Sequence, residues 1–475
     1  MFALLPGMVM AQKHDANMLF GYFTTNNDPL LGGASINFNM NPPLIKPDKQ
    51  KIDMNFYCGI CSDSTGQLAF YSNGISIRDT THNIMLNGDT INPGYFWLSW
   101  QKDSYPNGPF CFALPAPGQH NQYYFFHMAA DINDTTAISS PFYYTVVDMN
   151  GNNGLGEVTK KNQVLLPAGN DYIDPVAVKH GNGRDWWVIA GELSTPNVFT
   201  FLLDPEGVHG PIETQMPFHF PGREYQSVND MSPDGRTYVR CDGLNGLYIF
   251  DFDRCSGTLS NQRVLPFADE SFFGFATVFA ADSRHLYLSS FETVTVLDVL
   301  SPDISASFDT IAYFDGYASP FDPFVTGFFN PNLALDGKIY YATTNGTLSL
   351  HVIHEPSLPG HSADLEQHGV DLPKFNSGTM CQYPNYRLGE WEGSPCDTVN
   401  GQRPGDGFEK TDYYPPTVDK PAGYTMLPPI GKSRSGSDKP RAVPPNAAQM
   451  AIKQMQTRRL QAQEASEQSA GENKQ

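Results

Sequence analysis

A short phrase that recurs along the chain constrains its fold more than any other feature. It consists of an alternating apolar run that ends in Asp, then turn residues, then a second alternating run. Successive copies lie 45 to 69 residues apart, which is typical of a repeat architecture. Four clear copies and two weaker ones centre on these positions: Asp148, Asp204, Asp253 and Asp298, then Asp79 and His354.

An aromatic strand introduced by a tight turn precedes each copy, as in "SPDGRTYVRCDG" and "LDGKIYYATTNG". Asp-Gly and Asn-Gly turns between alternating apolar residues are hairpin signals, so each unit is predicted to hold three or four antiparallel strands. Such a unit leaves apolar sheet faces uncovered. Stacking the units around an axis buries both faces, which predicts a β-propeller.

The two ends of the propeller remain to be explained after six internal copies. Residues 18–39 and 378–388 each offer one or two strands and no full unit. Together they would make a seventh blade, and closing the ring in this way removes exposed sheet edges. The prediction is therefore an all-β, seven-bladed β-propeller over residues 18–400, closed by strands from both termini, with six or eight blades as the counting error.

The segments outside the propeller differ from it in composition. Residues 1–11 form a short apolar run with Val9 and Ala11 at the positions of a small-residue cleavage site, which predicts a signal-peptide remnant and export; an apolar N-terminal strand is the alternative. Residues 401–445 are rich in Pro and Gly and are expected to lie extended. Residues 446–475 begin with an Asn446 cap and are expected to be a polar helical or disordered tail.

The charge of the chain argues against nucleic acid as a partner, and its hydropathy argues against a transmembrane helix. The chain of 475 residues carries 50 acidic and 30 basic side chains, a formal net charge of −20, which argues against nucleic acid. No stretch approaches the roughly 20 apolar residues that a transmembrane helix needs. The expected partners are envelope or extracellular proteins or surface glycans.

Several phrases in order resemble the secreted β-propeller proteins of Bacteroidetes that are associated with type IX secretion. They include "VVDMNGNNGLGEVTKKNQVLL", "HGNGRDWWVIAG", "FDFDRCSGTLSN" and "PNYRLGEWEGSPCDT". The resemblance spans about residues 18 to 400 and implies an exported, often surface-held propeller without assigned catalytic residues. Relatives often continue into a β-rich sorting domain, whereas this chain continues into the Pro-rich segment.

The stretch "YIFDFDRCSGTLSNQRVLPF", residues 248–267, gathers charged residues and a cysteine, a combination that also occurs in active sites. Alternation places Tyr248, Phe250 and Phe252 on one strand face and Ile249, Asp251 and Asp253 on the other. An outer blade strand wetted on one face explains the pattern without catalysis.

Cysteines give no complete metal site. Cys58 and Cys61 form a C-x-x-C that could be a redox pair or half of a zinc site, but a second pair of ligands is missing. Residues three apart in a strand point to opposite faces, so the two thiols could join only at a bend. The other candidates for disulfides leave the connectivity open: Cys241, Cys255, Cys381 and Cys396.

Other possible sites have simpler explanations. Residues 148–157 resemble a calcium loop, but Gly and Glu fall at the wrong positions, and a hairpin turn explains them. The "GKS" of the tail lacks the first P-loop glycine, since Met426 occupies that place. Asp174, Asp230 and Asp282 begin or precede inner strands and could serve a metal-dependent, lactonase-like hydrolase in the channel, or act only in turns and caps.

We therefore assign no catalytic, metal or cofactor-binding residue and leave the cofactor open. The favoured hypothesis is an exported, non-enzymatic propeller that binds proteins or glycans, and the channel hydrolase is the alternative. Asp followed by Ser or Thr and a small or aliphatic residue recurs and resembles the O-glycosylation sequence of Bacteroidetes, although turn formation explains it too. The candidate acceptors are Ser64, Thr80, Thr90, Thr135, Thr310 and Thr398.

Overall fold

The computed structural model describes part of the chain in detail. The described residues are 12–24, 29–54, 58–105, 111–133, 136–217, 228–243, 245–267, 276–319, 324–343, 346–376, 378, 380–397 and 423–430. All of the described residues belong to one compact unit, residues 1–431. The predicted signal segment, most of the Pro-rich segment and the polar tail lie outside the described residues.

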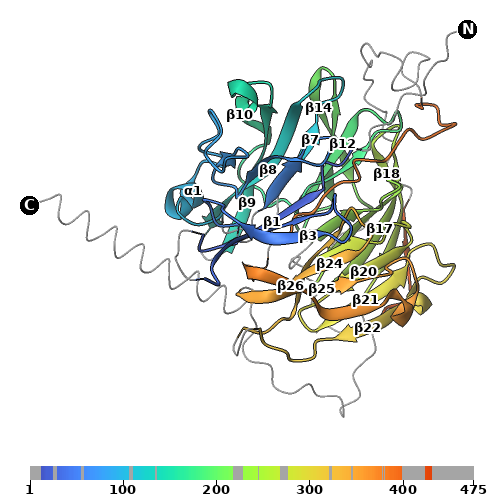
Figure 1. Ribbon diagram of the computed structural model, residues 1–475. Coiled ribbons are helices and arrows are strands. Elements are labelled where there is room, and N and C mark those ends of the chain that lie inside the picture. The colour runs from blue at the N-terminus through green and yellow to red at the C-terminus, as the bar shows by residue number, and fades with distance from the viewer. Residues whose placement is uncertain are drawn as a thin grey trace, which may run out of the picture. The chain divides into compact units, whose positions relative to one another are not determined.

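Seven antiparallel sheets form a seven-bladed β-propeller, as the repeat predicted (Figure 1). Blade 1 holds β1 (Asn17–Tyr22), β2 (Gly32–Asn37) and β3 (Leu44–Asp48), and blade 2 holds β4 (Gly59–Ser62), β5 (Leu68–Ser72) and β6 (Ile77–Arg78). Blade 3 holds β7 (Cys111–Pro115), β8 (Gln122–Asn133), β9 (Thr136–Asp148) and β10 (Glu157–Leu166).

The remaining four blades each hold four consecutive antiparallel strands. Blade 4 holds β11 (Val176–Lys179), β12 (Trp186–Gly191), β13 (Asn197–Asp204) and β14 (Gly207–Gln215). Blade 5 holds β15 (Val228–Met231), β16 (Thr237–Asp242), β17 (Gly246–Asp253) and β18 (Thr258–Leu265). Blade 6 holds β19 (Ala276–Phe279), β20 (His285–Ser289), β21 (Thr293–Asp298) and β22 (Asp309–Tyr313). Blade 7 holds β23 (Phe328–Leu333), β24 (Ile339–Thr343), β25 (Thr347–Ile353) and β26 (Leu365–Asn376).

Helices are few and short in the described part of the chain. The α-helix α1 (Tyr95–Trp100) lies between blades 2 and 3. Three 3₁₀ turns complete the set: η1 (Asn152–Gly154), η2 (Ser305–Ser307) and η3 (Gly360–Ala363). Within the described ranges, none of these helices has the length and apolar composition to cross a membrane.

The repeated aspartate is a turn residue at the end of the third strand of each blade in which it occurs. Its carboxylate accepts a hydrogen bond from the backbone N–H two residues later, which turns the chain into the next strand. The donor nitrogens lie 2.8 to 3.0 Å away. The pairs are Asp79 with Thr81, Asp148 with Asn150, Asp204 with Glu206, Asp253 with Cys255 and Asp298 with Leu300.

Blade 1 contains the same turn, built from an asparagine. Asn37 at the end of β2 accepts a hydrogen bond from the Asn39 N–H at 2.8 Å. By this correspondence β2 takes the place of a third strand, β1 of a second strand and β3 of a fourth. The innermost place of blade 1 is therefore not occupied by an N-terminal strand.

Residues from the C-terminal side lie beside β1 at this place, but they form no strand, which corrects the prediction for 378–388. Blade 1 has three strands, all from the N-terminal segment, and the described residues of 378–388 are irregular. Pro384 explains the difference because proline has no N–H to donate to a ladder. Met380 and Cys381 nevertheless pack in the apolar clusters on the two sides of β1.

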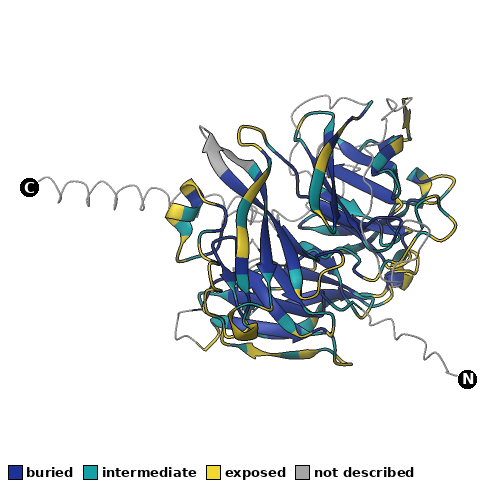
Figure 2. Ribbon diagram, turned by 90° about the horizontal axis from the view of Figure 1, so that it is seen from above, coloured by how far each residue is buried: buried dark blue, intermediate teal, exposed yellow. Residues whose placement is uncertain are grey.

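Apolar clusters between neighbouring blades form the core, and the strands are mostly buried while exposed residues concentrate in the connections (Figure 2). The seam between the first and last blades is one of these clusters. Met18 and Ala34 of blade 1 pack there with Tyr340 and Leu350 of blade 7. The ring is thus closed by side-chain packing between blades 7 and 1.

The charged stretch at 248–267 is structural. Tyr248, Phe250 and Phe252 face blade 4, and Ile249 faces blade 6, as the alternation predicted. The prediction of an outer strand was wrong, because β17 is the third strand and β18 pairs outside it. The Asp251 side chain is half exposed, and the Arg263 guanidinium on β18 donates a hydrogen bond to it at 2.6 Å.

A short part of the C-terminal segment adds a fifth strand to blade 5. Strand β27 (Tyr424–Met426) pairs in parallel with β18, and Ile430 is 3% exposed in the cluster between blades 5 and 6. The residues that precede this strand, 398–422, lie outside the described residues.

Candidate binding pocket beside the strap

Residues 380–397, called the strap, are covalently joined to the propeller at two points. Disulfides link Cys58 to Cys381 and Cys255 to Cys396. Cys58 immediately precedes the inner strand β4 of blade 2, and Cys255 lies in the turn between β17 and β18 of blade 5. The strap therefore leads from the inner edge of blade 2 to blade 5.

These pairings settle the connectivity that the sequence left open. The C-x-x-C is neither a redox pair nor a metal half-site, since Cys58 is bonded to Cys381 and Cys61 is a buried free thiol. Cys111 and Cys241 are also buried free thiols.

Two tyrosines anchor the middle of the strap. The Tyr383 hydroxyl donates to the Asn17 carbonyl at 2.7 Å, and the Tyr386 hydroxyl donates to the Ala113 carbonyl at 2.7 Å. The ring of Tyr386 is fully buried and lies edge-on to Trp186 of blade 4, with centroids 5.7 Å apart. Burial raises the pKa of both phenols, so they remain neutral donors.

Polar contacts fix the second half of the strap. Asn385 donates to the Pro233 carbonyl at 2.8 Å, and Arg254 donates to the Gly389 carbonyl at 2.6 Å. Arg387 forms two hydrogen bonds to Asp15, which precedes β1. Because Pro233 and Arg254 belong to blade 5 whereas Asp15 precedes blade 1, the strap connects parts of the ring that do not adjoin in sequence.

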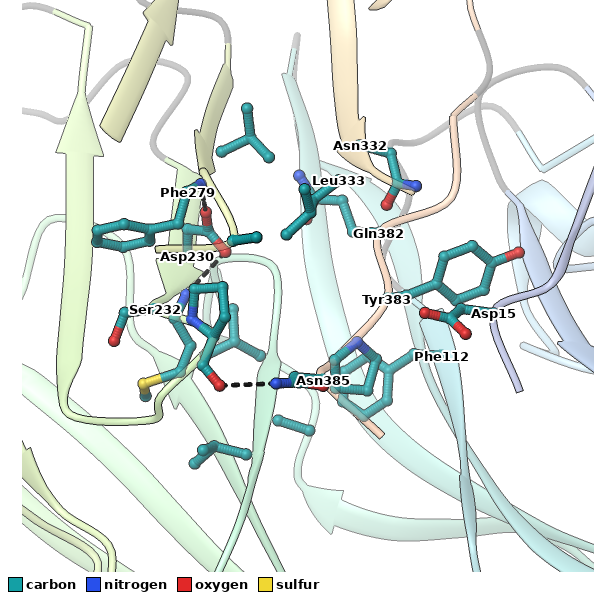
Figure 3. Close-up of a pocket in the computed structure, with 18 of the residues that line it drawn as sticks. Asp15, Phe112, Asp230, Ser232, Phe279, Asn332, Leu333, Gln382, Tyr383 and Asn385 are labelled. Carbon is teal, nitrogen blue, oxygen red and sulfur yellow. Dashed lines mark hydrogen bonds between the residues drawn. The ribbon is translucent and has the colours of Figure 1, made fainter. Parts of the chain in front are cut away.

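A pocket of about 320 Å³ lies beside the strap, between it and inner strands of blades 3 to 7 (Figure 3). Gln382 and Asn385 contribute the strap side. The opposite wall comes from β15, β19 and β23, which carry Asp230, Thr277 and Asn332. The walls between these polar groups are largely apolar.

Asp230 is positioned by two backbone donors. The Met231 and Phe279 N–H groups each donate to its carboxylate at 2.8 Å, which holds blades 5 and 6 together (Figure 3). Desolvation raises the pKa of Asp230 to about 7, so this carboxyl changes charge close to neutral pH.

Two further pocket residues carry unsatisfied polar atoms. Thr277 and Asn332 are 1% and 3% exposed. The Thr277 Oγ1 and the Asn332 Nδ2 have no hydrogen-bond partner among the residues that the structure describes. Both atoms are themselves buried, so neither is open to the pocket in this structure.

Of the three candidate carboxylates, the structure brings only Asp230 to this pocket. Asp174 precedes β11 and is not among the residues that line the pocket; burial raises its pKa to about 8. Asp282 caps the turn before β20 by accepting from the Arg284 and His285 N–H groups. The described residues contain no group of three or more His, Cys, Asp or Glu side chains that could hold a metal ion. Asp148 closes a hairpin turn, in agreement with the simpler interpretation of residues 148–157.

The candidate glycan acceptors that the structure describes are not among the residues that line the pocket. Thr80 is exposed, Ser64, Thr90 and Thr310 are half-buried, and Thr135 and Thr398 lie outside the described residues. Asp79 accepts from the Thr81 N–H, a turn contact that the alternative explanation of these triplets requires.

Comparison with known proteins adds little beyond the fold. No family model matches the chain, and no curated protein matches it. A proposed 6-phosphogluconolactonase from Bacteroides uniformis has 13% identity over 76% of this chain and 97% of its own, with a TM-score of 0.47. The periplasmic gluconolactonase PpgL of Pseudomonas aeruginosa has 13% identity over 76% and 97%, with a TM-score of 0.43. A virginiamycin B lyase from Staphylococcus aureus has 10% identity over 67% and 85%, with a TM-score of 0.37. These values carry no inference about activity.

Proposed function

We propose that this chain is an exported, non-enzymatic β-propeller that acts as a scaffold for binding proteins or surface glycans. The observation that carries the proposal is the strap, which is fastened by two disulfides and fills the innermost place of blade 1. Structural disulfides persist in oxidising compartments and are rare in the cytosol, which supports export. The two disulfides hold the strap against blades 2 and 5, which gives a rigid framework for binding.

The pocket chemistry favours recognition over hydrolysis. Asp15 and Arg387 neutralise each other, which leaves Asp230 as the acidic group of the lining without a cationic partner there. A metal-dependent hydrolase would need several ligands converging on one ion. The described lining offers one such carboxylate, so it gives no observation in favour of the alternative.

A binding assay tests the proposal directly. The purified full chain is applied to arrays of bacterial surface glycans and to an envelope extract with chemical crosslinking, and partners are identified by mass spectrometry. Saturable binding to a glycan or an envelope protein is expected. Turnover of lactones by protein that retains stoichiometric Ca²⁺ or Zn²⁺ in elemental analysis would overturn the proposal and favour the hydrolase.

Membership of the type IX-associated Bacteroidetes family, and O-glycosylation at some of the acceptor positions, belong to the same proposal. They are supported by the resemblance of the sequence phrases. Intact mass of the native protein tests the modification. A mass above that of the polypeptide by whole glycan units supports it, and the bare polypeptide mass, less any signal segment, contradicts it.

A further inference from the structure

We propose that residues 424–430, called the docking motif, can leave blade 5 of their own propeller and add to blade 5 of a second copy of this chain. The proposal goes beyond the proposed function, because it concerns association between copies and needs neither a glycan nor an envelope protein. It rests on how the motif is bound, on the small size of its contact and on the length of its tether.

The groove that holds the docking motif lies along β18, the outer strand of blade 5. Strand β27 pairs in parallel with β18. After β27, the Leu427 N–H donates to the Val264 carbonyl at 2.7 Å, and the Ile430 N–H donates to the Pro266 carbonyl at 2.9 Å. Addition of an extended peptide to a sheet edge is a common mode of recognition, in which main-chain bonds contribute affinity and side-chain pockets contribute specificity.

Two aliphatic side chains anchor the docking motif. Ile430 is 3% exposed and packs in the apolar cluster between blades 5 and 6, which also contains Leu265 and Ile304. Leu427 is half-buried and packs against the same cluster. The residues that carry these side chains also carry the two N–H groups that bond to blade 5 after β27.

The two prolines between the anchors suit the groove. Proline has no N–H, and the bonds to blade 5 in this part of the motif come from the anchors on either side. The Ser305 hydroxyl donates to the Pro428 carbonyl at 2.6 Å. Proline also restricts the free chain, so less entropy is lost when the motif docks. The sequence from Leu427 to Ile430 is therefore a self-contained recognition motif, which every copy of the chain carries together with the groove.

The contact is small enough to be reversible. The ladder of β27 covers three residues, and no disulfide holds the docking motif as the strap is held. Met426 is 51% exposed, and Thr425 and both prolines are exposed as well. Elements with few buried contacts open without unfolding of the whole domain. A fraction of the molecules therefore has a vacant groove and a free motif at equilibrium.

The tether is longer than docking within one chain requires. It starts at the strap, where Cys396 is bonded to Cys255 in the turn before β18. It ends at Tyr424, which pairs with Gln262 on β18 itself. The path along the strand from Cys255 to Gln262 is at most roughly 25 Å. Residues 398–422 could span up to roughly 80 Å when fully extended, so the motif can reach a second copy, and reciprocal exchange closes a dimer.

Sedimentation velocity of the full chain over a range of concentrations tests the exchange. A flexible tether gives docking within one chain an effective concentration of roughly 1 mM, so dimer is expected at about 0.1–1 mM protein. Ile430→Asp should lower the dimer fraction about fivefold or more, because a carboxylate is costly to bury in the apolar cluster. Met426→Asp is the matched control, since it places the same charge at an exposed position of β27, and it should dimerise as the wild type does.

A synthetic peptide of residues 422–432 gives a test that needs no variant of the chain. Excess peptide should return the wild-type dimer to monomer. It should also bind the Ile430→Asp chain, whose groove is vacant, about tenfold or more tightly than it binds wild-type monomer. The peptide with the Ile430→Asp change should do neither.

Three results would overturn the exchange. The first is a wild-type chain that stays monomeric over the whole concentration range, and the second is a dimer that persists undiminished in the Ile430→Asp chain. The third is a peptide that fails to bind the vacant groove. The scaffold function is independent of all three, because its test measures binding of glycans and envelope proteins.

Discussion

Both terminal nitrogens of the Arg387 guanidinium donate hydrogen bonds to the Asp15 carboxylate, with N···O distances of 2.7 and 2.8 Å. The two residues are 372 positions apart in the sequence. Arg387 belongs to the strap, and Asp15 precedes the first strand of blade 1. The ion pair therefore joins the two ends of the propeller, and both of its residues line the pocket. Asp15 is 3% exposed, so its carboxylate depends on this partner.

Arg387→Ala should destabilise the propeller by about 1–3 kcal/mol, because it leaves a buried carboxylate without its guanidinium. Urea unfolding followed by fluorescence measures the change. Arg284→Ala is the control, since Arg284 makes a similarly short bond to Asp298 at the surface and is half exposed. No measurable change is expected for the control, and an equal loss in both variants would contradict a special role for Arg387.

Asp253→Asn should change the free energy of unfolding by well under about 1 kcal/mol, because an amide oxygen can accept the same turn bond from Cys255. Asp253→Ala should cost about 1 kcal/mol, since it removes the acceptor. The comparison by chemical denaturation checks whether the repeated residue acts through its oxygen. A loss of several kcal/mol in the Asn variant would mean that the negative charge itself is required.

Asp174→Asn should change how stability depends on pH. The folded pKa of Asp174 is about 8, above its ordinary value, because the carboxyl is desolvated. The folded state therefore binds the proton more tightly than the unfolded state, and wild-type stability is lost as pH rises from about 4 to about 8.

The Asn variant cannot ionise at this position, so its stability relative to wild type should rise over the same interval by more than about 1 kcal/mol. Thermal and urea unfolding at pH 5 and pH 8.5 measure the difference. Asp371→Asn, at an exposed position of β26, should show no such trend. A wild-type advantage that grows with pH would contradict the sign.

Truncation separates the strap from the segments after it. Deleting 432–475 should leave melting unchanged, whereas deleting 401–475 should cost about 1.5–3 kcal/mol, because it removes β27 and the buried Ile430. Deleting 378–475 should cost far more, since it removes the strap with both disulfides and Tyr386. Equal melting of the last two truncations would contradict a stabilising role of the strap.

The number of blades could be predicted because the turn that marks each blade is encoded within a few neighbouring residues. The aspartate of the phrase and the N–H that it binds lie two residues apart, so one copy of the phrase contains the whole turn. The asparagine version at Asn37 uses the same chemistry, and recognising it would have shown that β1 takes a second-strand place.

The strap and the pocket were not predictable in the same way. Tyr386 binds the carbonyl of Ala113, 273 positions away, and no local pattern encodes such a contact. Asp230 was a candidate because it lies on an inner strand, but Thr277 and Asn332 are ordinary residues until three inner strands are placed side by side. A close reading of Pro384 could have warned that 378–388 would not form a ladder strand.

Disulfide mapping of the native protein tests the central claim most directly. Cells are lysed in an alkylating agent, and the protein is isolated and digested without reduction. Peptide mass spectrometry should find Cys58 joined to Cys381 and Cys255 joined to Cys396, with Cys61, Cys111 and Cys241 as thiols. Fully reduced cysteines, or any other pairing, would contradict an exported propeller whose strap is fastened by these two disulfides.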